Sequence, residues 1–183
     1  MNRIAIPTAS QTPAASQPLL DAVNKQLGVV PNLMKVIGNS PAALDGYLSL
    51  NGALGKGLLG ARTGERIALA IAEFNACSYC LSAHTYLGKN LAKLDDAEIA
   101  ANRQGTSTDT KAAAAVHFAT RVAHERGHVT DADIRTVKAA GYSDAETMEI
   151  VLHVALNILT NYVNEVAQTE IDFPVISPLR KAA

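Results

Sequence analysis

Both cysteines of the chain lie within one four-residue segment, Cys77-Ser78-Tyr79-Cys80, and His84 follows four residues later. A C-x-x-C spacing lets two sulfur atoms reach bonding distance, as in dithiol oxidoreductases. If the segment is helical, a rotation of about 100° per residue places Cys77, Cys80 and His84 within an arc of about 60°. The two thiols and the imidazole therefore share one stripe, and this stripe predicts thiol redox chemistry.

The predicted helix begins at about Ser78, which puts the cysteines at its amino end. Free backbone N–H groups and the positive end of the helix dipole favour a thiolate there. This position alone favours Cys77, the more N-terminal sulfur, as the more acidic thiol. A histidine one turn after Cys80 can accept its proton or stabilise the anion as imidazolium. Tyr79, between the cysteines, can shape a small pocket or donate a hydrogen bond.

Two glutamates precede the motif and are candidates for a carboxylate that assists His84. Glu73 lies four residues before Cys77, but a predicted break near Ala76 separates the two. Glu65 lies twelve residues before Cys77, at the start of the preceding predicted helix. Antiparallel packing of the two helices could bring Glu65 near His84. Sequence spacing alone does not decide between the two glutamates.

Less specific interpretations of the motif stand beside the catalytic one. Both cysteines can be buried small hydrophobic residues, with His84 a satisfied core histidine. A structural zinc site needs four protein ligands, whereas this motif supplies three and no second C-x-x-C exists. A stable structural disulfide is disfavoured in a cytoplasmic protein and would close too short a loop to stabilise much. The other histidines show no ligand pattern and are expected at the surface, in the core or at an interface: His117, His124, His128 and His153.

The composition limits the class of protein to which these residues belong. The chain has 183 residues, of which 48% are apolar and 4% aromatic, and its formal net charge is −1. This length predicts one domain, and the near-neutral charge argues against nucleic-acid binding. The longest apolar run of the chain, 151–163, contains His153, Asn157 and Asn161 and is too short for a membrane span. No secretory signal is visible at residues 1–7, so the protein is expected to be cytoplasmic.

Abundant alanine, scarce aromatic residues and the lack of alternating strand patterns predict an all-α fold. Gly55-Lys56-Gly57 lacks the setting of a phosphate loop and is expected to be a turn. Helices are predicted over about 17–27, 31–37, 41–53, 65–75, 78–90, 111–125, 130–140 and 144–168, with a turn and short helix at 94–98.

The longest predicted helix begins at a capping box formed by Ser143 and Glu146. Its apolar stripe is predicted to face a core or an oligomer contact: Met148, Val151, Leu152, Ala155, Leu159 and Val163. Before the first helix, residues 1–16 are expected to form an extended arm. After the last, the apolar tail 171–178 is broken by two prolines and is expected to dock on its own subunit or a neighbour.

The segment 64–84 resembles the alkyl hydroperoxidase D (AhpD)-like core of the carboxymuconolactone decarboxylase family. Glu65, Cys77, Cys80 and His84 fill its pattern E-x11-C-x-x-C-x-x-x-H. The stretch 161–174 looks like the end of the peroxidase-related branch. The resemblance implies an AhpD-like helical domain over residues 17–170 with a redox core at about 60–90, flanked by the arm 1–16 and the tail 171–183.

The resemblance also implies a thiol-dependent peroxidase that assembles as a trimer or hexamer and uses no metal or cofactor. Cys80 would be the peroxidatic thiolate, activated by His84, which Glu65 polarises. Cys77 would then resolve the sulfenic acid to a Cys77–Cys80 disulfide. An external dithiol, lipoyl-like in the family, would reduce that disulfide. The substrate would be an organic hydroperoxide or hydrogen peroxide.

Two departures limit this transfer. Enzymes of the AhpD type can carry a histidine immediately before the second cysteine, where this chain has Tyr79, so a proton relay through that position is in doubt. True decarboxylase members lack the cysteine pair, which disfavours lactone decarboxylation. The alternatives to a peroxidase are a general disulfide oxidoreductase with the same residues and a non-catalytic redox sensor or assembly module.

Overall fold

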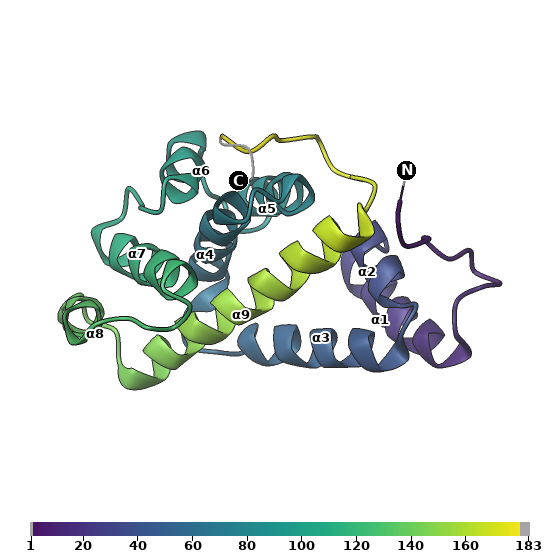
Figure 1. The fold of residues 1–183 in the computed structure, drawn as a ribbon, viewed down its shortest axis with the longest axis horizontal. Helices are drawn as coiled ribbons and strands as arrows, with labels where there is room; N and C mark the ends of the chain where they lie inside the picture. Colours follow the sequence, from purple (N-terminus) through teal and green to yellow (C-terminus); the bar gives the residue numbers. More distant parts are fainter. Residues whose placement is uncertain (1, 180–183) are drawn as a thin grey trace.

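The computed structural model describes residues 2–179, and within that range the chain folds into α-helices with no β-strand (Figure 1). The predicted all-α class is therefore confirmed. Met1 of the predicted arm and residues 180–183 of the predicted tail lie outside the described residues. The helices are α1 (Gln17–Leu27), α2 (Asn32–Ile37), α3 (Pro41–Leu54), α4 (Gly60–Phe74), α5 (Ser78–Asn90), α6 (Asp96–Arg103), α7 (Thr110–His124), α8 (Asp131–Ala139) and α9 (Asp144–Ala167), preceded by a 3-10 turn at Ala14–Ser16.

Helix α4 is the centre of the bundle, and α5, α6, α7 and α9 all pack against it. Every residue from 66 to 72 is buried. A helix that is apolar on all sides is stable only when neighbours cover all of it. Alanines alternate with larger aliphatic residues along this stretch, and their small side chains let the surrounding helices approach closely. The site described below is built on this covered helix.

Two hydrophobic clusters surround α4. One contains both cysteines and Tyr79 and draws its other buried residues from α1, α2, α3 and the end of α4. The second lies between α4, α7, α8 and α9. The thiols are therefore part of a packed core, and Cys77 and Cys80 are 0% and 2% exposed.

Arg66, the charged residue within the buried stretch of α4, is paired with Glu98 of α6. Arg66 Nε lies 2.7 Å from Glu98 Oε1. The same carboxylate accepts hydrogen bonds from Asn102, from Ser107 and from the backbone N–H of Thr108. Burial acts to raise the pKa of Glu98, but the hydrogen bonds from Ser107, Thr108 and Asn102 outweigh it and lower the pKa to about 2. This carboxylate fastens α6 and the segment after it to α4.

Helix α4 begins at Gly60, five residues before its predicted start at about residue 65. The reason is a contact across the fold: Glu149 Oε2 of α9 accepts the backbone N–H groups of Leu58 at 2.7 Å and Leu59 at 3.1 Å. A Cβ at Gly57 would lie only 2.5 Å from that oxygen. A carboxylate from α9, about 90 residues away, therefore orders the entrance to α4, and local sequence signals do not reveal it.

Of the two places predicted for the apolar stripe on α9, the core is wrong for most of its length, and the oligomer contact stays a prediction. Met148, Leu152 and Leu159 are 58%, 44% and 43% exposed. Ala155 is exposed as well, while Val151 and Val163 are half-buried. The buried face instead mixes aliphatic and polar residues: Thr147, Ile150, Val154, Leu156, Asn157, Thr160, Asn161, Asn164 and Ala167.

Polar residues can occupy the inner face of α9 because several satisfy their own hydrogen bonds. Asn157 Nδ2 donates to the carbonyl of His153, and Thr160 Oγ1 donates to the carbonyl of Leu156. Because both faces of α9 carry apolar residues, the hydropathy pattern of the sequence does not show which face is buried. By length and composition alone α9, with a mean hydropathy of 1.2, could cross a membrane, but 44% of its most apolar window is buried against the rest of the protein.

The arm and the tail both attach near the end of α9. The backbone N–H of Arg3 donates to the carbonyl of Ala167 at 2.7 Å, and the N–H of Glu170 donates to Asn2 Oδ1 at 2.9 Å. From there the tail crosses towards α5 (Figure 1), and Ile171, Phe173 and Ile176 pack against the cluster that holds the cysteines. The tail thus docks on its own chain, one of the two sites predicted for it.

Candidate active site

The backbone around the cysteines places Cys77 at the N-cap of α5. Ala76 adopts a left-handed φ of 51° between α4 and α5, as the predicted break requires. Cys77 Sγ then accepts the backbone N–H of Cys80 at 3.3 Å. A thiol sulfur therefore takes the place of the hydroxyl or carboxylate oxygen that usually caps a helix. The predicted position of the motif at the amino end of a helix is confirmed.

Cys80 lies one turn into α5 and is the more acidic thiol. The hydrogen bond from the Cys77 thiol is the main effect that lowers its pKa, to about 7, and it outweighs the effect of burial. The charge of His84, the hydrogen bond from Asn164 and the neighbouring Asn161 side chain act in the same direction. As the donor in that pair and as a buried thiol, Cys77 has a raised pKa. This order of acidity is the reverse of the one that the helix end alone favours.

His84 is paired with Glu65 across the α4–α5 interface. His84 Nδ1 and Glu65 Oε2 are 2.9 Å apart, and each side chain is 21% exposed. Burial acts to lower the pKa of His84, but the charge and hydrogen bond of Glu65 raise it above its ordinary value of 6.5. A carboxylate at Nδ1 leaves Nε2 free to exchange a proton. The geometry therefore joins an imidazole whose charged form Glu65 favours to the thiol stripe.

Between the two candidate carboxylates, the structure brings Glu65 to the histidine. Glu73 is engaged elsewhere: Arg103 Nε of α6 lies 2.7 Å from its Oε2, and its Oε1 accepts the backbone N–H of Leu179 in the tail. Glu73 thus joins α4, α6 and the tail. Glu65 has only His84 among its described side-chain hydrogen-bond partners.

Three further residues belong to the surroundings of Cys80. Asn164 Nδ2 donates a hydrogen bond to Cys80 Sγ at 3.2 Å, and Asn161 is fully buried beside it on the same face of α9. Tyr47 of α3 has a pKa raised first by burial and then by the charges of Cys80 and Glu65. The sequence analysis missed all three. Asparagines spaced three apart in an otherwise apolar helix were the available signal.

Tyr79 points away from the thiols and holds the tail. Its hydroxyl donates to Asp172 Oδ1 at 2.8 Å and accepts the backbone N–H of Leu33 at 3.1 Å. Asp172 Oδ2 also accepts the backbone N–H of Asn32. The ring of Phe173 meets that of Tyr79 edge-on, with centroids 5.8 Å apart. Tyr79 thus donates a hydrogen bond, as predicted, but that bond goes to the strap formed by residues 171–179.

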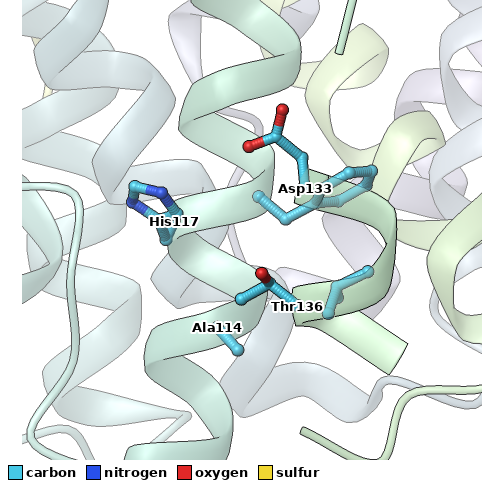
Figure 2. Close-up of a pocket in the computed structure, with 6 residues that line it drawn as sticks. Ala114, His117, Asp133 and Thr136 are labelled. Carbon is cyan, nitrogen blue, oxygen red and sulfur yellow. The ribbon is translucent and has the colours of Figure 1, made fainter. Parts of the chain in front are cut away.

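One cavity lies beside this site, and another lies away from it. One of about 220 Å³ lies between α5 and the strap, lined by Tyr86, Lys89 and Pro174 among others. A second, of about 40 Å³, lies between α7 and α8, where His117 and Asp133 line it (Figure 2). Asp133 is the capping-box carboxylate of α8, so its role there is structural. Residues 2–179 contain no group of three or more His, Cys, Asp or Glu side chains arranged as metal ligands.

The remaining histidines lie as expected. His117, His124 and His128 are exposed, and His153 is half-buried. A Cβ on Gly64 would lie 3.0 Å from His153 Cε1, so α9 and α4 approach closely beside Glu65.

One family model matches the region of the chain that contains this site. Residues 41–125 match the family model of the carboxymuconolactone decarboxylase family, a region that contains Glu65, Cys77, Cys80 and His84. No curated protein matches the chain.

Several solved structures share the fold. An uncharacterized peroxidase-related protein from Silicibacter sp. TM1040 is 21% identical, with a TM-score of 0.81 over 92% of this chain and 91% of that one. An AhpD-core, peroxidase-related protein from Ralstonia eutropha JMP134 is 22% identical, with a TM-score of 0.83 over 93% and 92%. A cysteine-to-alanine variant of the debrominase Bmp8, in complex with 2,3,4-tribromopyrrole, is 18% identical, with a TM-score of 0.76 over 93% and 91%.

At these identities the likeness to solved structures concerns the fold, while the family match covers the dithiol motif itself. The expected resemblance is therefore confirmed: residues 41–125 match the model of the carboxymuconolactone decarboxylase family, and the chain has the helical fold of the AhpD-core, peroxidase-related proteins.

Proposed function

We propose that the protein is a thiol-dependent peroxidase that reduces organic hydroperoxides or hydrogen peroxide through a Cys77–Cys80 dithiol/disulfide cycle. The observation that carries the proposal is the environment of Cys80. Its pKa is lowered to about 7, first by the hydrogen bond from Cys77 and also by the charge of His84, which Glu65 holds at 2.9 Å. Near neutral pH a large fraction of Cys80 is therefore thiolate, the nucleophilic form.

In the first step the Cys80 thiolate attacks one oxygen of the peroxide O–O bond. An S–O bond forms, the O–O bond breaks, and the departing alkoxide or hydroxide takes a proton from the His84 imidazolium. Cys80 is thereby oxidised to a sulfenic acid and the peroxide is reduced to an alcohol or water. Glu65 is a positioning residue in this step because it orients and charges His84.

In the second step Cys77 attacks the Cys80 sulfur. The S–S bond forms, the S–O bond breaks, and the oxygen leaves as water after accepting a proton. Cys77 caps the helix that carries Cys80, so the resolving sulfur needs little movement. An external dithiol, of the lipoyl type, would then reduce the disulfide by thiol–disulfide exchange.

The proposal extends to partners and location. We propose a homo-oligomer, a trimer or hexamer, in which the exposed apolar stripe of α9 supplies a subunit contact. A helix face that leaves Met148, Leu152 and Leu159 exposed at 58%, 44% and 43% supports such a contact. The cycle uses a small peroxide and a dithiol in the cytoplasm, and involves neither nucleic acid nor a membrane.

The deciding experiment is a peroxide titration of the fully reduced protein. Free thiols are counted and any new disulfide is located by mass spectrometry. We expect one equivalent of peroxide to convert both thiols into the Cys77–Cys80 bond, and a dithiol to restore them. Cys80→Ser should abolish catalytic turnover, while Ser78→Ala, a change between the cysteines at a residue that is not part of the relay, should retain it.

Three other outcomes would replace the proposal. Faster turnover of model disulfides than of peroxides would indicate a general disulfide oxidoreductase. Disulfide formation that changes the assembly state with negligible turnover would indicate a redox sensor. Turnover of 2,3,4-tribromopyrrole but not of peroxides would indicate the chemistry named for the debrominase neighbour. Full activity of Cys80→Ser would rule out the cycle itself.

A further inference from the structure

Two asparagines of α9 lie close to the sulfur of Cys80. Asn164 Nδ2 donates to Cys80 Sγ at 3.2 Å. Asn161, one turn earlier, is 0% exposed, and its Oδ1 accepts a hydrogen bond from Asn75 Nδ2 at 2.8 Å. That bond fixes the orientation of the Asn161 carboxamide, and the Asn161 side chain also acts to lower the pKa of Cys80. Two amide N–H donors therefore lie beside one sulfur.

The same two carboxamides hold polar atoms that have no partner. Asn161 Nδ2 and Asn164 Oδ1 are both buried without a hydrogen bond that meets ordinary geometry. Buried polar groups are nearly always paired, because leaving one unpaired costs the full desolvation of that group. Here one unpaired group is a donor and the other an acceptor, and both belong to residues that surround a reactive sulfur. A hydroxyl, which donates one hydrogen bond and accepts others, complements such a pair.

We propose that Asn161 and Asn164 form an amide cradle that stabilises the Cys80 thiolate and then holds the hydroxyl of the sulfenic acid formed on it. In the thiolate state both carboxamides donate to sulfur. Once the S–O bond has formed, the sulfenic O–H donates to Asn164 Oδ1 and its oxygen accepts from Asn161 Nδ2. The second half of this proposal rests on the proposed peroxidase cycle, whereas the first half concerns the resting thiolate alone.

The cradle has a chemical consequence for the second step. When Cys77 attacks Cys80 Sγ, the electron pair of the breaking S–O bond goes to the oxygen, which leaves as water after taking a proton. An N–H donor from Asn161 stabilises the charge that develops on that oxygen. Held in this way, the sulfenic acid faces Cys77 and is kept from a second peroxide that would convert it to sulfinic acid.

The first test measures the pKa of Cys80 in a Cys77→Ser background, by thiolate absorbance in the ultraviolet as a function of pH. Asn164→Ala and Asn161→Ala should each raise that pKa by about one unit, since a hydrogen bond to a charged group is lost. Asn157→Ala is the matched control, because Asn157 is equally buried on α9 but donates to the carbonyl of His153. It should leave the pKa unchanged.

A measurement on the unsubstituted α9 keeps the proposal testable if the alanine variants fail to fold. The side-chain NH2 signals of Asn161 and Asn164, followed by NMR, should shift with the Cys80 titration, and the Asn157 signal should not. The cradle would be overturned if the pKa of Cys80 in folded variants stays within about 0.2 of the parent value. It would also be overturned if the NH2 signals do not shift as Cys80 titrates.

The second test follows the sulfenic acid. In Cys77→Ser protein treated with one equivalent of hydrogen peroxide, dimedone labelling should trap Cys80 as sulfenic acid. The Asn161→Ala and Asn164→Ala variants should lose the label several-fold faster as sulfinic acid accumulates. Equal lifetimes would overturn the second half of the proposal.

These readouts separate the cradle from the proposed function. A raised pKa in the asparagine variants of a protein that never reacts with peroxide supports the thiolate cradle and refutes the peroxidase. An unshifted pKa in a protein that turns over peroxide normally refutes the cradle and leaves the peroxidase standing.

Discussion

Glu65 and His84 are separated by nineteen residues, yet Glu65 Oε2 lies 2.9 Å from His84 Nδ1 across the contact between α4 and α5. The pair connects a helix that is buried on all sides to the helix whose first turn holds both thiols. The Glu65 carboxylate raises the pKa of the His84 imidazole, whereas burial alone would lower it. A charged imidazole in turn favours the thiolate of Cys80.

Replacing the carboxylate should therefore lower the pKa of His84. In Glu65→Gln we expect that pKa, followed by NMR, to fall below its wild-type value, because the amide keeps a hydrogen bond but not the charge. Peroxide-dependent loss of thiols at pH 7 should slow by about tenfold or more. Glu73→Gln is the control: it removes the pairing with Arg103 and should leave the His84 titration unchanged. An unaltered His84 pKa in Glu65→Gln would exclude the relay.

The reactivity of Cys80 should follow its own ionisation. With a pKa of about 7, its alkylation by iodoacetamide should rise about tenfold per pH unit below 7 and level off above it. Because the Cys77 thiol is the main hydrogen-bond donor, Cys77→Ala should move the profile to higher pH. Cys77→Ser, which keeps a donor, should move it less. Identical profiles for the two variants would show that Cys77 does not set the acidity.

The buried carboxylate of Glu98 should make the fold sensitive to acid. Its pKa is lower in the folded protein, about 2, than its ordinary value of 4.5. The stabilisation is therefore complete above about 4.5 and is lost as pH falls from there towards 2. Glu98→Gln should lower the free energy of unfolding at pH 7 by about 2–3 kcal/mol and flatten its dependence on acid.

Chemical unfolding measured at several pH values tests this, with Asp96→Asn as the control. Asp96 pairs with Lys89, but its side chain is 84% exposed, and exposed ion pairs contribute little. An acid profile of Glu98→Gln that matches the wild type would contradict the assignment.

The strap over α5 should control access to the thiols. Tyr79→Phe removes the hydroxyl that bonds both Asp172 and Leu33. We expect a loss of about 1–3 kcal/mol in the free energy of unfolding and faster alkylation of Cys80, since the strap is less firmly held. Tyr86→Phe offers a matched comparison, because Tyr86 also contacts Phe173 but is 46% exposed. If Tyr79→Phe leaves the alkylation rate unchanged, the strap does not cover the route to the sulfur.

The outer stripe of α9 should determine the assembly state. Leu152→Asp places a charge at the middle of the exposed apolar face and should reduce the mass measured by light scattering to that of one protomer. Leu91→Asp is the control, since Leu91 is 67% exposed at the end of α5. An oligomer that survives Leu152→Asp would assign the subunit contact to another surface.

The sequence predicted the thiol stripe well, because Cys77, Cys80 and His84 are close in the chain and a helix fixes their relative directions. Spacing alone did not choose between Glu65 and Glu73, since that choice depends on how α4 meets α5 and on Arg103, which engages Glu73 from α6; the family pattern named Glu65. Spacing also missed the acidity of Cys80 relative to Cys77. The helix end acts on both sulfurs, and the hydrogen bond between them decides the order.

The largest error of the prediction from the sequence concerned which face of α9 is buried. Hydropathy treats asparagine and threonine as outward-facing, whereas here Asn161 and Asn164 face the core beside a sulfur, and Leu152 faces outward. Asn157 and Thr160 bond to carbonyl groups of α9 itself, whereas the other two polar residues have partners from distant parts of the chain. For Asn161 that partner is Asn75, and for Asn164 it is Cys80.

The sulfur that caps α5 is also one of the two atoms that change oxidation state in the proposed cycle. A sulfur atom is a weak acceptor, and one already bonded to a second sulfur is weaker still. Each turnover would then loosen and restore the first turn of the helix, and with it the segment that Tyr79 and Ser82 hold by hydrogen bonds to Asp172 and Ile176. The backbone amides in the first turn of α5 would therefore exchange their hydrogens at different rates in the oxidised and the reduced protein. A reductant would meet a surface that differs from the one a peroxide meets.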